Sequence, residues 1–269
     1  MKKGGNMKRY FKIYKMLFLQ YLKGLMEYKI DFFVGLFAFL FTQAAGIGFI
    51  YLIFLKIPQL NGWTYEQILF IYGFSQIPRA IDHFFTDNLW LLSGRIISRG
   101  EFDKYLIRPI NPLFHIIAEV VQPDAIGEMI VGVFLVTASI IRMHITISLG
   151  RFLIGIFLII CGTLIYFSIK LVFASVAFWT KYSQQMLFMI YQLSDFAKYP
   201  IGIYAKWIRV IITFIIPFAF VAFFPAGYIV GKNNAEWAIF GTLIAAITSI
   251  VISGIVWRCG LKAYESAGS

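Results

Sequence analysis

The chain has 269 residues, of which 60% are hydrophobic, 19% are aromatic and only 14% are charged. A soluble globular chain is about a quarter charged, so this composition excludes a water-soluble fold whose surface is covered by polar groups. The net charge of +11 does not indicate a nucleic-acid partner, because the basic residues lie in short segments between long apolar runs. We therefore expect membrane lipids, and no nucleic acid, around this chain.

Residues 1–30 predict a cytoplasmic amphipathic helix. One helical face would carry lysines: Lys8, Lys12, Lys15 and Lys23. Another face would carry apolar and aromatic side chains: Phe11, Tyr14, Phe18, Tyr21, Leu22 and Leu25. This spacing favours a helix that lies in the membrane plane, with its lysines toward anionic headgroups. A signal that only sets the orientation of the chain fits the pattern equally well.

Within residues 31–257, six segments have the roughly 20 mostly apolar residues that a membrane-spanning helix needs. They are about 32–55, 66–92, 113–141, 152–179, 208–224 and 237–257. The second and third contain charges and a proline, and Pro217 is expected to bend the fifth. Residues 183–206 carry Asp195, Lys198 and Pro200, and favour a cytoplasmic or interfacial segment over a seventh span.

Lysine and arginine concentrate before the first span, between the second and third, between the fourth and fifth, and in the tail 258–269. Cytoplasmic loops carry this excess, so both termini are expected in the cytoplasm. The predicted fold is an all-α integral membrane protein. It has six transmembrane helices, an N-terminal amphipathic interfacial helix and short cytoplasmic coupling helices.

The cytoplasmic loop 94–112 predicts a short helix. A glycine, two acidic residues suited to a first helical turn and two prolines mark its limits: Gly100, Glu101, Asp103, Pro109 and Pro112. Three apolar side chains would project from it: Phe102, Tyr105 and Leu106. Such a helix could dock on a cytoplasmic partner, although an ordinary interfacial loop fits the pattern as well.

Charges inside the second and third spans need partners. Arg79 and Glu128 would sit at similar depth in antiparallel neighbours, and Asp124 lies one helical turn from Glu128. An unpaired charge at that depth costs on the order of 3 kcal/mol. We therefore expect Arg79 to pair with Glu128 or Asp124, unless the spans are shorter and these residues lie near water.

Small residues recur every four positions in the last span: Gly241, Ala245, Ser249 and Ser253. The first span repeats the pattern at Ala38, Thr42 and Gly46. Small residues at this spacing let helix backbones approach closely. The pattern predicts packing within the chain, with a dimer face as the alternative.

No motif for chemistry is present. The sequence lacks G-x-x-x-x-G-K-[ST], H-E-x-x-H and G-x-S-x-G, so neither a phosphate-binding loop nor a catalytic site of these kinds is predicted. The histidines His83, His115 and His144 are about 30 residues apart and indicate no metal site. We expect no cofactor in this chain.

Several strings in the sequence resemble a known family. They are Met7–Phe11 (MKRYF), Gly100–Leu113 (GEFDKYLIRPINPL), Lys198-Tyr199-Pro200, Ile216–Phe220 (IPFAF) and Phe224-Pro225-Ala226. Together they are similar to bacterial permease subunits of the type-2 ABC exporters, in a branch of largely uncharacterised export permeases. The resemblance covers nearly the whole chain, and the string in the 94–112 loop is its most specific part.

The resemblance implies partners and roles. A separate ATP-binding subunit would hold ATP and Mg²⁺, and a second permease subunit, identical or not, would complete a dimer in the bacterial cell membrane. A coupling helix that docks on the ATPase would comprise Glu101, Phe102, Asp103, Tyr105, Leu106 and Arg108. The segment around Lys198 would make a weaker contact. Many members have re-entrant helices before the last span, but here only about a dozen residues separate the last two predicted spans.

The expected function is therefore that of an ABC export permease for a hydrophobic or amphipathic substrate. A membrane-embedded lipid-modifying enzyme would need a catalytic cluster, for which the in-span candidates are Arg79, Asp82, Asp124 and Glu128. A secondary transporter would more often show two similar halves, which this sequence does not. The pattern assigns no substrate-binding residues.

Overall fold

The computed structural model describes residues 4–25 and 29–266, and within these ranges the regular elements are helices, with one isolated bridge between Leu60 and Trp63. Four helical segments are long and apolar enough to cross a membrane: Phe33–Phe54, Ala125–Arg142, Leu149–Thr180 and Trp237–Ala263. A fifth is possible if the bent pair Lys206–Ile215 and Phe218–Ile229 forms one span. The chain is thus a multi-pass membrane protein, although the predicted count of six is not reached by length and composition alone.

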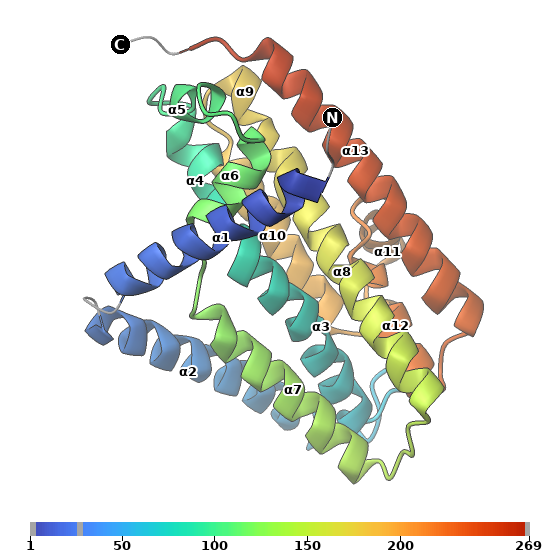
Figure 1. Cartoon of the computed structure of the whole chain (residues 1–269). Coiled ribbons are helices and arrows are strands. Elements are labelled where there is room, and N and C mark those ends of the chain that lie inside the picture. Colours follow the sequence, from blue (N-terminus) through green and yellow to red (C-terminus); the bar gives the residue numbers. More distant parts are fainter. Residues whose placement is uncertain (1–3, 26–28, 267–269) are drawn as a thin grey trace.

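The elements follow one another along an elongated bundle (Figure 1). The first half contains α1 (Gly4–Leu25), α2 (Lys29–Phe54), α3 (Tyr65–Thr86), α4 (Asn88–Leu91), η1 (Leu92–Ile96), α5 (Asp103–Leu106), α6 (Pro112–Glu119) and α7 (Ala125–Arg142). The second half contains α8 (Leu149–Ser175), α9 (Ala177–Thr180), α10 (Gln184–Leu193), η2 (Ser194–Lys198), η3 (Ile201–Ile203), α11 (Lys206–Val210), η4 (Ile211–Ile215), η5 (Phe218–Phe220), α12 (Phe223–Ile229), η6 (Trp237–Gly241) and α13 (Thr242–Ala263).

Helix α3 forms the centre of the bundle and packs on both α7 and α8. It has the length of a span, but polar side chains such as Gln76, Arg79 and Asp82 make it less apolar than the four candidates. The crossing with α7 is close at two glycines. A Cβ atom added to Gly73 would lie 2.9 Å from the carbonyl oxygen of Gly132. Neighbouring helices, rather than lipid, therefore surround the polar face of α3.

The bundle has two apolar cores, one toward each end. We call the end that carries residues 94–112 the near end, and the end that carries residues 55–64 the far end. The near-end core includes Leu89, Leu92, Phe102, Tyr105, Leu171, Phe178 and Trp257. The far-end core includes Trp63, Phe70, Phe74, Leu158, Tyr166, Phe218 and Ala245. Along α3 and α4, Arg79 and Asp82 come after the far-end core residue Phe74 and before the near-end core residue Leu89. Along α8, Lys170 lies between Tyr166 of the far-end core and Leu171 of the near-end core.

Residues 183–204 run along the bundle antiparallel to α3, with some side chains buried against the bundle and others, such as Met186, Phe188 and Met189, exposed. The amide of Ser183 donates to the Ser93 carbonyl at the near end, over 2.9 Å. Tyr191 then packs on Trp90, with ring centroids 5.5 Å apart, and the Lys198 ammonium lies 5.5 Å from the Tyr72 ring. The segment reaches the far end, where Gly202 contacts the side chain of Asn61. The segment consists of the short elements α10, η2 and η3, and its interfacial placement stays a prediction.

The predicted fifth span over 208–224 corresponds to two helices that are bent by 73° at a break containing Pro217, so the bend predicted at this proline is confirmed. Both ends of this hairpin lie at the far end: Arg209 donates to the Gly202 carbonyl over 3.2 Å, and Lys232 donates to the Gly62 carbonyl. Its bend reaches the interior, where the Phe218 ring lies 5.5 Å from the Tyr166 ring of α8. Pro217 lies at the bend and supplies no backbone donor, which favours this break.

Helix α1 lies across the near-end half of the bundle (Figure 1). Its Tyr10 ring packs edge-on against Phe114 at 4.7 Å, and the Tyr10 hydroxyl accepts from the Asn111 amide at 3.3 Å. Three of the predicted lysines, Lys8, Lys12 and Lys15, are exposed, as is the aromatic Phe11. The predicted positions Leu22, Lys23 and Leu25 lie outside the described side chains.

Candidate functional site

The near-end loop 94–112 holds the six predicted coupling residues, but two of them point inward. Phe102 and Tyr105 are 0% and 1% exposed. The Phe102 ring lies 5.1 Å from Phe178 and 4.9 Å from Tyr264, next to the C-terminal end of α13. The prediction that both side chains project from the loop is therefore wrong: they anchor it to the helical bundle.

Polar contacts hold the same loop. Tyr105 donates from its hydroxyl to Glu119, and the Asp103 carboxylate accepts from the Tyr264 hydroxyl over 3.0 Å. Burial and the Asp103 carboxylate raise the pKa of Tyr264 to about 12. Glu101 accepts from Arg95 over 3.1 Å, and this hydrogen bond lowers the pKa of the Glu101 carboxyl. These contacts join the loop to α6 and to the chain that follows α13.

A strip of consecutive residues remains on the surface of this loop: Leu106, Ile107, Arg108 and Pro109. The side chain of Ile107 is the most open, at 82% exposed, and that of Leu106 is 48% exposed. Arg108 is held by His115 Nε2 at 2.8 Å. Sequence reasoning missed Ile107, because α5 has a single turn and the chain leaves helical geometry after Leu106. This strip (106–109) is an apolar and basic contact surface.

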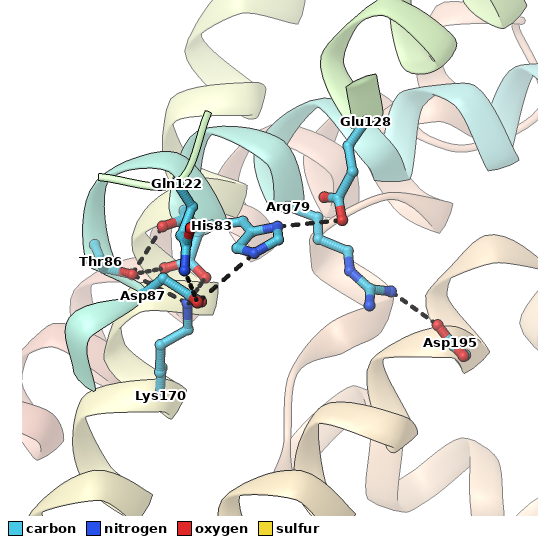
Figure 2. Close-up of polar contacts among 9 residues, drawn as sticks. Arg79, His83, Thr86, Asp87, Gln122, Glu128, Lys170 and Asp195 are labelled. Atoms are coloured by element: carbon cyan, nitrogen blue, oxygen red, sulfur yellow. Dashed lines mark hydrogen bonds and ion pairs between the residues drawn. The ribbon is translucent and has the colours of Figure 1, made fainter. Parts of the chain in front are cut away.

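Charged and polar side chains of α3, α7, α8 and η2 form a layer of contacts, which we call the charge layer (Figure 2). Lys170 of α8 lies 2.8 Å from Asp82 Oδ2 and 3.3 Å from Asp87 Oδ1, and it donates to the Thr86 hydroxyl over 3.2 Å. The side chains of Lys170 and Asp82 are both 0% exposed. The two carboxylates and the hydroxyl thus take the place of the water that the Lys170 ammonium loses on burial, and the ammonium does the same for the Asp82 carboxylate.

Further along the layer, Arg79 and Glu128 have partners other than the predicted ones (Figure 2). Arg79 lies 2.9 Å from Asp195 Oδ1, and Glu128 lies 3.3 Å from His83 Nδ1. The predicted pairing of Arg79 with Glu128 or Asp124 is wrong. Helix α7 begins only at Ala125, so Glu128 lies in its first turn and meets His83, one turn of α3 beyond Arg79.

Sequence reasoning missed four members of this layer: His83, Asp87, Asp195 and Lys198. Two pairs were visible as helical spacings, His83 with Asp87 at i,i+4 and Asp195 with Lys198 at i,i+3, the latter 2.7 Å apart. Lys170, as a charge inside a long apolar run, also indicated a buried carboxylate partner. Asp124 has one carboxylate oxygen that is buried without a partner in the described part of the chain.

A cavity of about 370 Å³ lies beside the charge layer, between α2, the start of α3 and residues 192–204. Its walls are apolar and aromatic: Phe49, Ile50, Ile53, Phe54, Leu60, Ile68, Phe196, Tyr199, Ile203 and Tyr204. Gln192 and Asp195 add polar groups, and the Asp195 side chain is 46% exposed. The cavity can therefore hold an apolar molecule that carries a hydrogen-bond donor or a cationic group.

The small residues of α13 pack within the chain over part of their length. A Cβ atom added to Gly241 would lie 2.5 Å from Cε1 of Phe220, so the hairpin closes on this position. Ala245 and Ser253 are buried, whereas Ser249 is only partly so. Among the described residues, no group of three or more His, Cys, Asp or Glu side chains could hold a metal ion.

Comparison with known proteins gives one match. The sequence model of the family described as "ABC-2 family transporter protein" matches residues 39–268, which is most of the chain. No curated protein and no solved structure matches. An all-helical bundle with four or five apolar spans is consistent with this family. The chain belongs to the ABC-2 family of transporter proteins, as the transmembrane permease component of an ABC transporter.

Proposed function

We propose that this protein is the membrane subunit of an ABC exporter in the bacterial cell membrane, driven by a separate ATP-binding subunit. The family match carries the proposal, since it covers the spans and the near-end loop together. ATP and Mg²⁺ would bind to the partner, because the chain has no phosphate-binding loop of its own. The permease itself would hold no cofactor.

The proposed topology has six crossings: α2, α3, α7, α8, residues 184–203 and α13. The hairpin of α11 and α12 would be re-entrant from the far end, which is supported by the contacts of Arg209 with Gly202 and of Lys232 with Gly62. Polar side chains of α3 and of residues 184–203 meet inside the bundle, where Arg79 and Asp195 neutralise each other. The excess of lysine and arginine supports a cytoplasmic near end with both termini.

The surface strip 106–109 would dock on the ATPase. When ATP binding closes the ATPase, a force on this strip would pass into the helices through Phe102, which packs on Phe178 of α9 and on Trp257 of α13. The loop and the two helix ends would move together, because their rings interlock. Leu106 and Arg108 keep the predicted coupling role, while Phe102, Tyr105, Asp103 and Glu101 position the strip.

The cavity at Asp195 is the proposed entry site for a hydrophobic or amphipathic substrate. Exposed residues of α2, such as Phe49, form part of its wall, so a molecule could enter sideways from the lipid. A second permease subunit, identical or different, would complete the transport path. A lipid-modifying enzyme is a weaker interpretation, because Lys170 and Asp82 are sealed from any substrate.

The test is whether the tagged protein captures a separate ATP-binding subunit when it is purified. Leu106→Ala with Ile107→Glu should abolish capture of the ATPase and ATP-driven transport in reconstituted vesicles. Lys262→Ala, which removes an exposed charge at the same end, should leave both unchanged. If the unmodified protein captures no ATPase, or if the double variant captures it normally, the proposal fails.

A further inference from the structure

A groove runs between the hairpin and α13. It consists of two adjoining pockets of about 350 Å³ and 270 Å³, which share Thr213, Phe214 and Trp237. Along α13 the groove is lined by Gly241, Ile244, Ala245, Thr248, Ser249 and Ile252. Three residues of the predicted small-residue ridge thus face an open groove. From Trp237 to Ile252 it extends roughly 22 Å at 1.5 Å per helical residue.

One end of this groove is basic. Lys206 and Arg209 line its first pocket, and both are exposed. Arg209 Nη2 donates to the carbonyls of Gly202 and Tyr204, over 3.2 and 3.4 Å, which fixes the guanidinium at the mouth. The nearby Trp237 is 51% exposed, as is typical of aromatic residues at the headgroup level of a membrane. The mouth therefore attracts an anion at the depth of lipid headgroups.

Thr213 gives an independent indication of a ligand. Its side chain lines both pockets and is buried, yet its hydroxyl has no hydrogen-bond partner within the described residues. Other threonines in the apolar helices, such as Thr163 and Thr248, donate to the carbonyl four residues earlier. The π-helical turn of η4 around Thr213 does not satisfy this hydroxyl in the same way. It is available to donate to a ligand in the groove.

We propose that this groove binds one anionic phospholipid. The phosphate would lie at Lys206 and Arg209, an ester oxygen near the head would accept from Thr213, and one acyl chain would follow the small residues of α13. The groove is longer than the roughly 15 Å that half a bilayer core requires, so it holds a chain of ordinary length. Glu236 precedes Trp237 but lines neither pocket, which leaves the mouth net positive.

A second copy of the chain is a less suitable occupant. The small residues could receive a helix, but another copy would bring its own apolar face, and neither the two cations nor the Thr213 hydroxyl would gain a partner. A lipid satisfies all three features together. The site is independent of the ATPase and of the substrate path, so its test needs neither.

The experiment measures quenching of tryptophan fluorescence by brominated lipid chains. The purified protein is placed in vesicles of brominated phosphatidylglycerol or phosphatidylcholine, and the signal of Trp237 is isolated by subtracting a Trp237→Phe variant. Each basic side chain near an anionic headgroup gives roughly a five-fold preference. The unmodified protein should therefore bind phosphatidylglycerol at least five-fold more tightly. Lys206→Gln with Arg209→Gln should lower this ratio to about one, whereas the control Lys56→Gln should retain it.

A second pair of variants tests the groove itself without changing charge. Thr248→Phe fills the groove, whereas Ile247→Phe adds the same ring to an exposed neighbour that does not line it. Only Thr248→Phe should reduce quenching of Trp237 by both lipids. Equal quenching by the two lipids in the unmodified protein, or equal loss in Lys56→Gln, would overturn the proposal. Disulfide cross-linking between copies across the groove, with quenching unchanged by Thr248→Phe, would assign the groove to a second subunit instead.

Discussion

Two parts of the charge layer use the same kinds of residue in different surroundings. Around Lys170, the ammonium and the Asp82 carboxylate are sealed between α3 and α8 and are 0% exposed. Around Asp195, the carboxylate meets Arg79 and Lys198 on one oxygen while its side chain is 46% exposed beside a cavity. The sealed part fixes two helices to each other, because water cannot reach either ion to take the place of its partner. The open part can exchange a protein partner for a ligand.

The largest expected effect is the loss of the sealed cation. Lys170→Met leaves two carboxylates near each other without their ammonium, and breaking a buried pair in this way destabilises by about 3–5 kcal/mol. Thermal unfolding of the purified protein in detergent measures the change. The double variant Lys170→Met with Asp82→Leu should recover much of the loss. If the two substitutions add without recovery, the pair is not coupled.

A smaller effect is expected at the open part, where a second cation remains. Arg79→Gln removes one of the two partners of Asp195, and the coupling between Arg79 and Asp195 should be about 1 kcal/mol in a double-mutant cycle. The same cycle between Arg79 and Glu128 serves as the control and should give less. A larger coupling to Glu128 would show that the direct pair predicted from the sequence forms after all.

The open part should also affect transport more than stability. Asp195→Asn keeps the shape of the side chain, so unfolding should change little while vesicle transport falls several-fold, if the cavity holds the substrate. Asp82→Asn should show the opposite pattern, with a large fall in unfolding temperature and a smaller effect on transport. If the two variants reduce transport equally under conditions where both are equally folded, the sealed and open parts do not differ in function.

The smallest expected effect concerns the near-end loop, which lies outside the candidate spans. Because the pKa of Tyr264 is raised to about 12, its hydrogen bond to Asp103 contributes stability that is complete below the ordinary tyrosine pKa near 10. This contribution should disappear as pH rises from about 10 to 12. The difference in unfolding temperature between the unmodified protein and Tyr264→Phe should shrink over that window. A constant difference would argue against the contact.

Several helices could be predicted from the sequence with nearly correct limits. The run 32–55 contains the candidate span Phe33–Phe54, and the runs 152–179 and 237–257 lie within Leu149–Thr180 and Trp237–Ala263. Hydropathy is a local property that adds along the chain, so it locates these apolar helices. The third span begins later than predicted, at Ala125, because Pro123 interrupts the helical backbone before it.

The partners of the charges and the path of residues 183–229 were decided only by the tertiary structure. Arg79 pairs with Asp195, which lies 116 residues away, and the sequence holds several carboxylates that could have taken that place. Phe102 and Tyr105 have the spacing of a projecting face, yet the rings of Phe178, Trp257 and Tyr264 surround Phe102, and Tyr105 packs on His115. Local pattern determines which segments are helical and apolar. Which side chains meet depends on distances between helices, and no local pattern contains those distances.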